Sequence, residues 1–202
     1  MDPVKYSVAR LTAASAEVSI SRPVRRVAAI LLGSLLVAVC AHVSIPLWFT
    51  PVPVTLQTFA VLLLALTLSP AVAASALVLY LIEGAAGLPV LSPNGPVGFL
   101  HLFGPTGGYL LAYPPAAFLI SWLRRSLLRA RPRLSDFTAS TLAGAVGSLL
   151  ILASGAAWFS LLTHQSAGTV VALAVIPFLP GDILKLIAAG GAASSLRRWR
   201  RP

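Results

Sequence analysis

Three charged side chains stand apart from the other charges of this sequence: Glu83, Asp182 and Lys185. No Asp, Glu, Lys or Arg occurs at residues 27–82, 84–123 or 137–181. An ionisable side chain within an apolar helical bundle is costly and marks a functional candidate. Glu83 ends an apolar segment, where a carboxylate is commonly only solvated, so the other two residues are the stronger candidates.

Asp182 and Lys185 are three residues apart, directly after Pro180 and Gly181, which mark an irregular entry to a helix. On a helix this spacing places both side chains on one face, and a helix start adds unpaired N–H groups. The pair predicts a site for a ligand that carries amide-like donors and an acceptor or carboxylate. The alternative is that Asp182 caps the helix and pairs with Lys185, although a cation in the first turn opposes the helix dipole.

Other polar residues give weaker signals. Asn94, in Ser-Pro-Asn-Gly, is typical of a turn, and a binding role is the alternative. The three histidines have no partners at metal-ligand spacing, so we predict neither a metal nor a cofactor. Ser154-Gly155 resembles the end of a nucleophile motif, but Leu152 occupies the place of the first glycine and no base is placed beside the serine. An intramembrane hydrolase is therefore a low-ranking alternative.

The basic residues are clustered. All of the 15 Lys and Arg residues except Lys185 lie at residues 5–26, 124–133 or 197–201. With 57% hydrophobic and 10% charged residues, the chain is far from the roughly 25% charge of soluble proteins. Basic clusters flanking apolar segments follow the positive-inside rule. We therefore predict an integral membrane protein whose charge of +10 serves topology and anionic lipid, not nucleic acid.

Prolines and glycines divide the apolar sequence into expected helices, because they end helices. A spanning helix needs roughly 20 residues, so 202 residues allow an all-α membrane bundle of six transmembrane helices. We expect one domain at residues 23–202 after a polar N-terminal tail at residues 1–22. The expected helices cover residues 25–44, 54–69, 70–86, 106–123, 137–162 and 172–196.

The helix count also predicts orientation. Four expected helices separate the first two basic clusters and two separate the last two, so all three clusters share a side. The positive-inside rule makes that side cytoplasmic, so both termini of this cell-membrane protein are expected in the cytoplasm. The outer loops, at about residues 45–53, 87–105 and 163–180, contain no Lys or Arg. Because irregular backbone near lipid needs partners, we expect these loops to cover an outward-facing recess.

Four motifs follow one another along the chain: TPVPVTLQTFA at 50–60, GLPV at 87–90, GPTGGYL at 104–110, and PFLPGD with Lys185 at 177–185. Together they resemble the BioY family, the biotin-specific substrate-binding (S) components of energy-coupling factor (ECF) transporters. The resemblance implies a high-affinity membrane binder that takes up biotin from the outer side and is not an enzyme. The sequence contains no phosphate-binding Gly-Lys-Ser/Thr loop, so ATP hydrolysis would fall to a partner. Binding of another vitamin is the alternative.

The resemblance also implies site residues. Asp182 and Lys185 match an Asp and a Lys that contact biotin, and Asn94 is the best match for an asparagine that binds it. Gln57, in the first motif, is a further ligand-binding candidate. Tyr109 and Phe49, with the neighbouring Trp48, are expected to cover the apolar part of biotin.

Small residues on the first expected helix form the remaining candidate surface. Ala29 and Gly33, and Ser34 and Ala38, are four residues apart and allow close contact with another helix. The resemblance implies docking there onto a transmembrane coupling protein, which works with two ATPase subunits. Packing within the bundle is the alternative.

Overall fold

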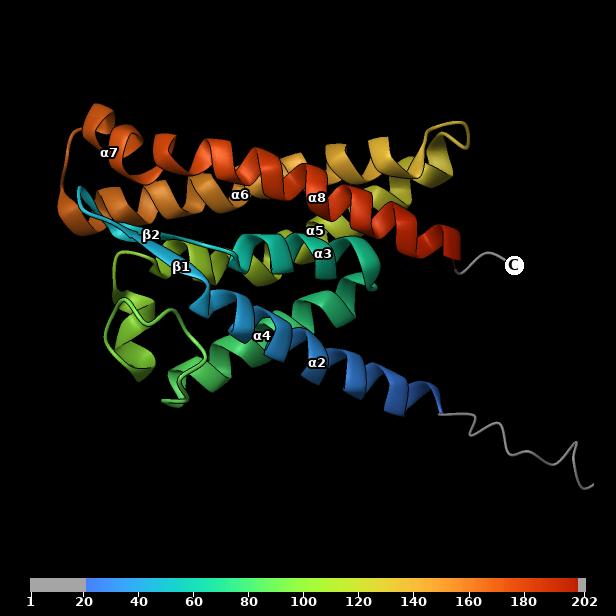
Figure 1. The fold of residues 1–202 in the computed structure, drawn as a ribbon, viewed down its shortest axis with the longest axis horizontal. Helices are drawn as coiled ribbons and strands as arrows, with labels where there is room; N and C mark the ends of the chain where they lie inside the picture. Colours follow the sequence, from blue (N-terminus) through green and yellow to red (C-terminus); the bar gives the residue numbers. More distant parts are fainter. Residues whose placement is uncertain (1–20, 200–202) are drawn as a thin grey trace, which may run out of the picture.

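The computed structural model describes residues 21–199, and this part of the chain is mostly helical. The predicted tail at residues 1–22 lies almost entirely outside the described residues, and the first described helix begins at Arg22. Figure 1 shows long helices packed lengthwise, with a short hairpin at one end. The elements are α2 (Arg22–His42), β1 (Ser44–Leu47), β2 (Thr50–Thr55), α3 (Gln57–Thr67), α4 (Pro70–Ala85), η1 (Gly98–Phe103), α5 (Gly107–Ala130), α6 (Asp136–Thr163), α7 (Ala167–Ala174), η2 (Ile176–Phe178) and α8 (Leu179–Trp199).

The first five predicted helices each correspond to one observed helix, α2 to α6, with shifts at their ends. The largest shift is in α5, which continues to Ala130 instead of ending near residue 123. The extension carries several arginines, and Arg is a good helix former. Pro114 and Pro115 lie inside α5 without ending it. Neighbouring helices compensate for such prolines in membrane bundles.

The sixth predicted helix, at residues 172–196, is divided. The chain forms α7, a 3-10 turn η2, and then α8 from Leu179. Pro177 lies at the start of η2, where it cannot donate a backbone hydrogen bond. Pro180 lies in the first turn of α8, a position that tolerates proline. The irregular entry is therefore upstream of the predicted one, and Asp182 lies within the first turn of α8.

The expectation of an all-α fold needs one correction, because the described residues include a two-stranded antiparallel hairpin, β1–β2. Ser44 pairs with Thr55 and Ile45 with Val54, and the register shifts between Ile45 and Leu47. Prolines are tolerated in such a ribbon because each strand has a free edge. The predicted outer loop at residues 45–53 is thus an ordered structure.

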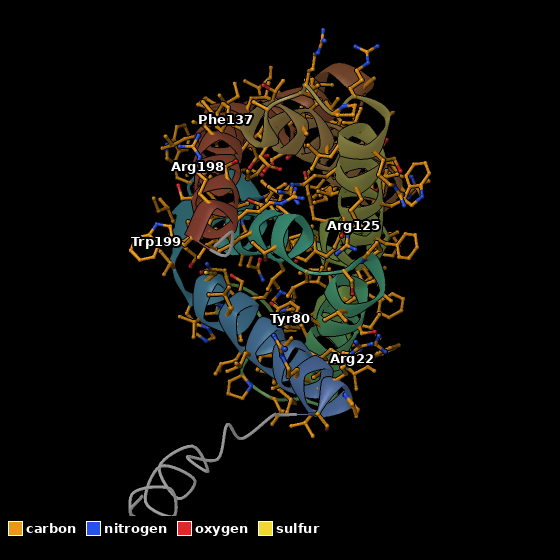
Figure 2. All side chains as sticks on the ribbon, turned by 90° about the vertical axis from the view of Figure 1, so that its right-hand side faces the viewer. Arg22, Tyr80, Arg125, Phe137, Arg198 and Trp199 are labelled. Carbon is orange, nitrogen blue, oxygen red and sulfur yellow. The ribbon has the colours of Figure 1, made fainter. Side chains whose placement is uncertain are left out.

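Basic residues from the three clusters lie at one end of the long axis of the bundle. The N-terminal end of α2 and the C-terminal end of α8 lie at the same end in Figure 1, opposite the hairpin. Figure 2 faces that end and labels Arg22, Arg125 and Arg198, one from each basic cluster. We call this the basic end and the opposite one the hairpin end. These three arginines lie at one end of the bundle, as expected if the clusters share a side of the membrane.

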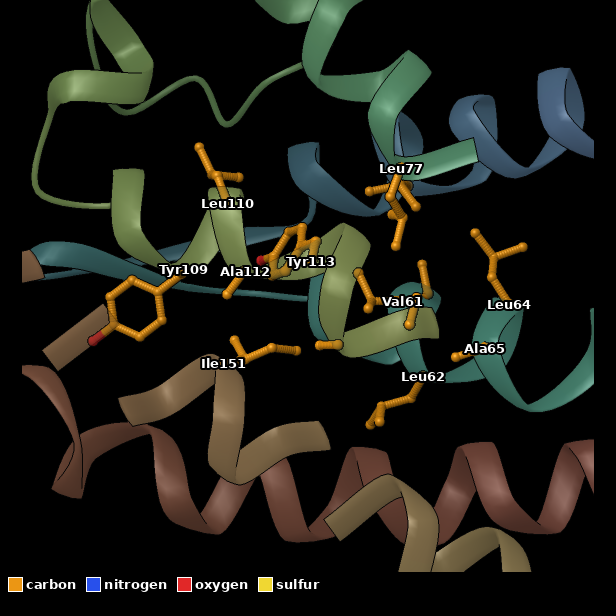
Figure 3. Packing of buried hydrophobic residues seen from close by; sticks show 14 of the residues in the cluster. Val61, Leu62, Leu64, Ala65, Leu77, Tyr109, Leu110, Ala112, Tyr113 and Ile151 are labelled. Atoms are coloured by element: carbon orange, nitrogen blue, oxygen red, sulfur yellow. The ribbon is translucent and has the colours of Figure 1, made fainter. Parts of the chain in front are cut away.

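Three helical stretches are long and apolar enough to cross a membrane: Arg22–His42, Asp136–Thr163, and Ala167–Trp199 taken across its 3-10 turn. Two shorter helices, Gln57–Thr67 and Pro70–Ala85, are also apolar. These shorter helices contribute Tyr80, Leu62 and Leu77, which are among the largest fully buried side chains in the core of the bundle. Figure 3 shows the apolar residues of α3, α4, α5 and α6 interdigitating there.

Candidate ligand-binding site

A small cavity lies toward the hairpin end. It is partly open, has a volume of about 50 Å³, and is lined by residues of β2, α3, α5, α6, η2 and α8, together with the segment between α4 and α5. Four of the six residues predicted from the sequence to bind ligand line it: Gln57, Tyr109, Asp182 and Lys185. The structure thus brings together candidates that are more than 100 residues apart in the sequence.

The charged pair of α8 is held by a residue of α3. Lys185 Nζ lies 3.3 Å from Asp182 Oδ1 and donates to Thr58 Oγ1 at 2.9 Å. Thr58 Oγ1 in turn donates to Asp182 Oδ1 at 3.4 Å. Each charged side chain retains only 12% of its exposure. A nearly buried ion pair needs such additional hydrogen bonds to offset its desolvation.

The predicted alternative for Asp182 and Lys185 is therefore partly correct, because the two residues do form an ion pair. The same side chains also line the cavity. The carboxylate has a second oxygen, and the ammonium has three N–H groups. Both groups retain hydrogen-bonding capacity that the contacts with each other and with Thr58 do not use. The pair can serve as a paired donor and acceptor for a ligand.

Gln57 occupies the first position of α3 and is almost fully buried, at 4% exposure. Its Nε2 donates to the hydroxyl of Tyr80 at 2.5 Å, and its Oε1 accepts from Thr55 Oγ1 at 3.1 Å. These bonds fix the amide between β2 and α4. The side chain lines the cavity with an orientation that is already determined.

Aromatic side chains form the apolar part of the lining. Tyr109 and Tyr113, one turn apart on α5, are both buried, and Figure 3 shows them on the side of α5 near Ile151 of α6. The hydroxyl of Tyr109 donates to the carbonyl of Ala174. The Tyr109 ring also packs against Phe178, with ring centroids 6.0 Å apart. The site therefore combines one polar wall with several aromatic surfaces, as small-molecule sites commonly do.

Glycines make room for this arrangement. A Cβ atom at Gly155 of α6 would lie 2.2 Å from ring atoms of Tyr109, and one at Gly108 of α5 would lie 2.2 Å from Trp158 Cβ. The glycines of the GPTGGYL motif could serve ligand approach or helix packing. In the structure Gly108 serves packing, because it lets α5 approach α6 closely.

Ser92 is a lining residue that the sequence did not single out. It is 7% exposed, and its hydroxyl is buried without a hydrogen-bond partner among residues 21–199. Ser92 lines the cavity together with His101, whose Nδ1 is 2.9 Å from the carbonyl of Pro96. A buried hydroxyl without a partner is unusual in proteins. Ser92 is thus available to a ligand.

Two predicted ligand residues lie away from the cavity. Asn94 is on the surface, where its Nδ2 donates to Ser44 Oγ of β1 at 3.2 Å. Phe49 is 39% exposed at the hairpin turn and packs edge-on against Trp48, which is 96% exposed. Asn94 joins the α4–α5 segment to the hairpin. Asn94 belongs to the α4–α5 segment and Phe49 to the hairpin, and other residues of both segments line the cavity.

The small residues of α2 face the interior of the bundle. Gly33, Ser34 and Ala38 are buried, and only Ala29 is half-buried. A Cβ at Gly33 would lie 3.0 Å from Ala76 Cβ of α4, and Ser34 donates to the carboxylate of Glu83. These contacts agree with the alternative of packing within the bundle. They also explain Glu83, which is a hydrogen-bond acceptor between α4 and α2.

Comparison with known proteins places the chain among relatives. The BioY family model matches residues 8–202. Biotin transporter BioY2 of Lactococcus lactis subsp. cremoris is 37% identical over 159 residues, which covers 78% of this chain and 82% of the relative. Biotin transporter BioY of Thermotoga maritima is 34% identical over 163 residues, covering 81% and 90%. The BioY protein of Rhodobacter capsulatus is 34% identical over 182 residues, covering 84% and 91%.

A solved structure agrees with the sequence matches. The crystal structure of the S-component for biotin from an ECF-type ABC transporter superposes with a TM-score of 0.78 at 25% identity. The alignment covers 88% of this chain and 93% of that one. The matched proteins are transporters and not enzymes, so the hydrolase alternative is dropped. On the family match, the identities and the fold, this chain belongs to the BioY family.

Proposed function

We propose that this chain binds biotin in the cavity beside Asp182 and Lys185 and serves as the S component of an ECF transporter. The observation that carries the proposal is the Asp182–Thr58–Lys185 cluster, which lines a cavity with aromatic walls. The names of the family's relatives supply the ligand.

The chemistry of biotin matches this lining. Its ureido ring has two N–H donors and one strong acceptor oxygen, its bicycle and valeryl chain are apolar, and the chain ends in a carboxylate. Asp182 can accept from the ureido N–H groups. Lys185 can donate to the ureido oxygen or pair with the carboxylate. Tyr109 and Phe178 offer surfaces for the apolar part.

Entry of biotin requires movement of the segments that lie over the cavity. The cavity of about 50 Å³ is small beside the 300 Å³ or more of typical small-molecule sites. The covering elements are the hairpin and the α4–α5 segment, which Asn94 and Ser44 join. We infer that these elements move outward together when biotin enters. Asn94 and Phe49 would then reach the ligand from the cover.

The proposed membrane placement follows from the separation of charge. We propose a multi-pass protein of the cell membrane with six membrane-crossing segments, the last formed by α7, η2 and α8. The basic end and both termini would be cytoplasmic under the positive-inside rule. The cavity, at the other end of α8 from Arg197, would then open to the outer side.

The proposed partners are a transmembrane coupling protein and two ATPase subunits. Because Gly33, Ser34 and Ala38 are buried, we propose that the coupling protein contacts α2 through Ala29 and the neighbouring exposed side chains. Leu32 and Leu35 are 66% and 59% exposed.

Isothermal titration of the detergent-purified protein with biotin tests the ligand. We expect Asp182→Asn and Lys185→Met each to weaken binding by about 2–5 kcal/mol, as for one partner of a buried charge pair. Glu83→Gln is the matched control, because Glu83 is also a hydrogen-bonded carboxylate but does not line the cavity. Unchanged affinity in both site variants would reject the assignment. A competition panel of other vitamins decides between biotin and a different vitamin.

A further inference from the structure

A second, larger cavity lies at the basic end. It is a partly open cavity of about 550 Å³ between α3, α5 and α8. The lining includes four arginines and no Asp or Glu among the described residues. The four arginines are Arg124, Arg125, Arg129 and Arg197, and the apolar lining includes Leu128 and Leu196.

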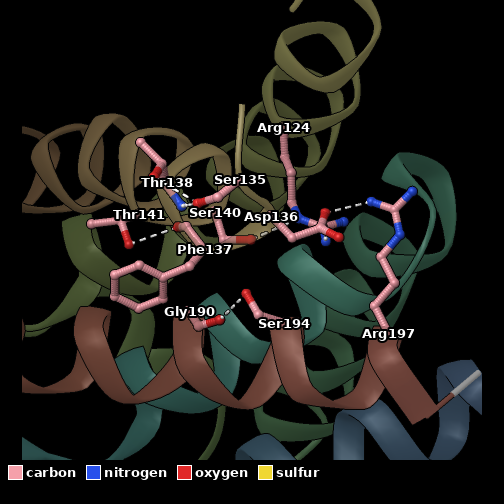
Figure 4. A network of polar contacts seen from close by, with 10 residues as sticks. All are labelled: Arg124, Ser135, Asp136, Phe137, Thr138, Ser140, Thr141, Gly190, Ser194 and Arg197. Atoms are coloured by element: carbon pink, nitrogen blue, oxygen red, sulfur yellow. Dashed lines mark hydrogen bonds and ion pairs between the residues drawn. The ribbon is translucent and has the colours of Figure 1, made fainter. Parts of the chain in front are cut away.

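Two of these arginines are held in place by one carboxylate, as Figure 4 shows. Asp136 Oδ1 accepts from Arg124 Nη2 at 3.2 Å and from Arg197 Nη1 at 2.6 Å. Arg124 is 9% exposed, and its Nε also donates to Ser140 Oγ at 2.8 Å. The guanidinium groups are therefore oriented before any ligand arrives, which lowers the entropic cost of binding.

The cavity has an excess of positive charge. Four arginines line it, and Asp136 is ion-paired with two of them, so four positive charges less one negative charge leave +3. Arg125 donates to the carbonyl of Leu68 at 3.2 Å and Arg129 to Ser126 Oγ at 3.5 Å. A guanidinium has five N–H donors, so both retain donors for an anion. Arginine forks match phosphate oxygens in particular.

Apolar side chains complete the walls, and they distinguish among anions. Leu66, Leu128 and Leu196 line the same cavity as the arginines, and Leu196 is 48% exposed on the outer surface of α8. A free phosphate ion gains nothing from such walls, whereas an amphipathic molecule can use both. Basic pockets between membrane helices at the cytoplasmic side suit phospholipid head groups.

We propose that this cavity binds the phosphate head group of an anionic membrane lipid, with the acyl chains lying along α5 and α8. The inference rests on the proposed placement of the basic end at the cytoplasmic surface. The lipid would join α3, α5 and α8 at the basic end. Two of these helices carry Thr58, Asp182 and Lys185 toward their other ends, so the bound lipid also stabilises the framework of the biotin site.

The test uses the full chain purified in detergent and stripped of lipid. Phosphatidylglycerol, phosphatidylcholine with the same acyl chains, and inorganic phosphate are added separately. Thermal unfolding gives the stabilisation, and native mass spectrometry gives the lipid retained. The cavity variant is Arg125→Gln with Arg129→Gln. The control variant is Arg131→Gln with Arg133→Gln, which removes the same charge from exposed positions outside the cavity.

We expect phosphatidylglycerol to raise the melting temperature of the unchanged chain more than the other two additives. The cavity variant should bind this lipid about 10- to 30-fold more weakly, at about 1 kcal/mol for each arginine. The control variant should bind it as the unchanged chain does. Biotin titration of each variant reports separately on the fold and on the proposed function, so the lipid comparison stands even if biotin does not bind.

Three results would overturn the lipid proposal. Equal losses in the cavity and control variants would mean diffuse surface attraction. Equal stabilisation by inorganic phosphate would mean a site for the free ion. Normal lipid binding by the cavity variant, together with loss of the coupling protein during co-purification, would assign the cavity to an acidic segment of that partner.

Discussion

Thr58 of α3 connects Asp182 and Lys185, the two charged residues of the proposed biotin site, to a different helix. Its hydroxyl accepts from Lys185 at 2.9 Å and donates to Asp182 at 3.4 Å. A hydroxyl can accept and donate at once, so this single group fits between a cation and an anion. Thr58 thereby holds both side chains in the orientation in which they line the cavity.

Replacing Thr58 by valine keeps the shape of the side chain and removes the hydroxyl. We expect biotin affinity to fall by about 1–2 kcal/mol, or roughly 5- to 30-fold, because two hydrogen bonds to charged groups are lost. Isothermal titration measures the change. Thr141→Val is the control, because the Thr141 hydroxyl bonds only to the carbonyl of Phe137 on its own helix. Equal affinity in the two variants would contradict a positioning role for Thr58.

Replacing Ser92 by alanine should affect protein stability and biotin affinity in different ways. Its buried hydroxyl has no partner within the described chain, so Ser92→Ala should leave the melting temperature of the ligand-free protein unchanged or raise it. The same variant should weaken biotin binding by about 0.5–1.5 kcal/mol, the worth of one hydrogen bond. Ser194→Ala is the control, since Ser194 is equally exposed at 7% but bonds to the carbonyl of Gly190. A destabilised Ser92→Ala with normal affinity would argue against a ligand contact.

The sequence pointed to four residues that line the cavity, Gln57, Tyr109, Asp182 and Lys185, but not to Thr58 or Ser92. Asp182 and Lys185 could be found because charge within an apolar stretch is conspicuous in a single sequence. Thr58 and Ser92 have ordinary polar side chains, and only three-dimensional contact distinguishes them. The bond from Lys185 to Thr58 joins residues 127 positions apart, which spacing along one helix cannot reveal.

The helices α5 and α6 can pack closely because α6 has a glycine, Gly155, where it meets Tyr109 of α5. Gly155→Ala would place a Cβ 2.2 Å from the Tyr109 ring, and overpacking of this kind costs about 1–3 kcal/mol. We expect a lower melting temperature and weaker biotin binding, because Tyr109 also lines the cavity. Gly191→Ala is the matched control in α8, where a Cβ meets nothing within 4 Å. That control should stabilise the protein by up to about 1 kcal/mol, and a fall in melting temperature shared by both variants would refute the packing argument.

The ends of helices could be predicted from the sequence more readily than the structure of the segments that connect the helices. Proline and glycine act locally, so the boundary between α3 and α4 near Ser69-Pro70 appears directly in the sequence. The hairpin could not be predicted in this way, because prolines at Pro51 and Pro53 exclude a helix without specifying a strand partner. The end of α5 was missed for the opposite reason. Its arginines resemble a polar loop, yet they continue the helix as far as Ala130.

The whole molecule is polarised along its length. Asp182 lies in the first turn of α8 and Arg197 in the last, a separation of about 22 Å at 1.5 Å per residue. The proposed biotin cavity is at one end of this axis and the arginine-lined cavity at the other. A single orientation in the membrane therefore determines which face each cavity serves.

Cysteine labelling tests that orientation across one helix. Gln165, between α6 and α7, and Pro132, between α5 and α6, are both exposed and lie at opposite ends of α6. In intact spheroplasts, a membrane-impermeant maleimide should label Gln165→Cys and spare Pro132→Cys, because the arginines around Pro132 favour the cytoplasm. After lysis both should react, whereas the buried native Cys40 should stay unlabelled in the unchanged chain. The reverse pattern would mean that the chain has the opposite orientation in the membrane, with the proposed biotin cavity facing the cytoplasm. Labelling of both positions in intact spheroplasts would mean that α6 does not cross the membrane.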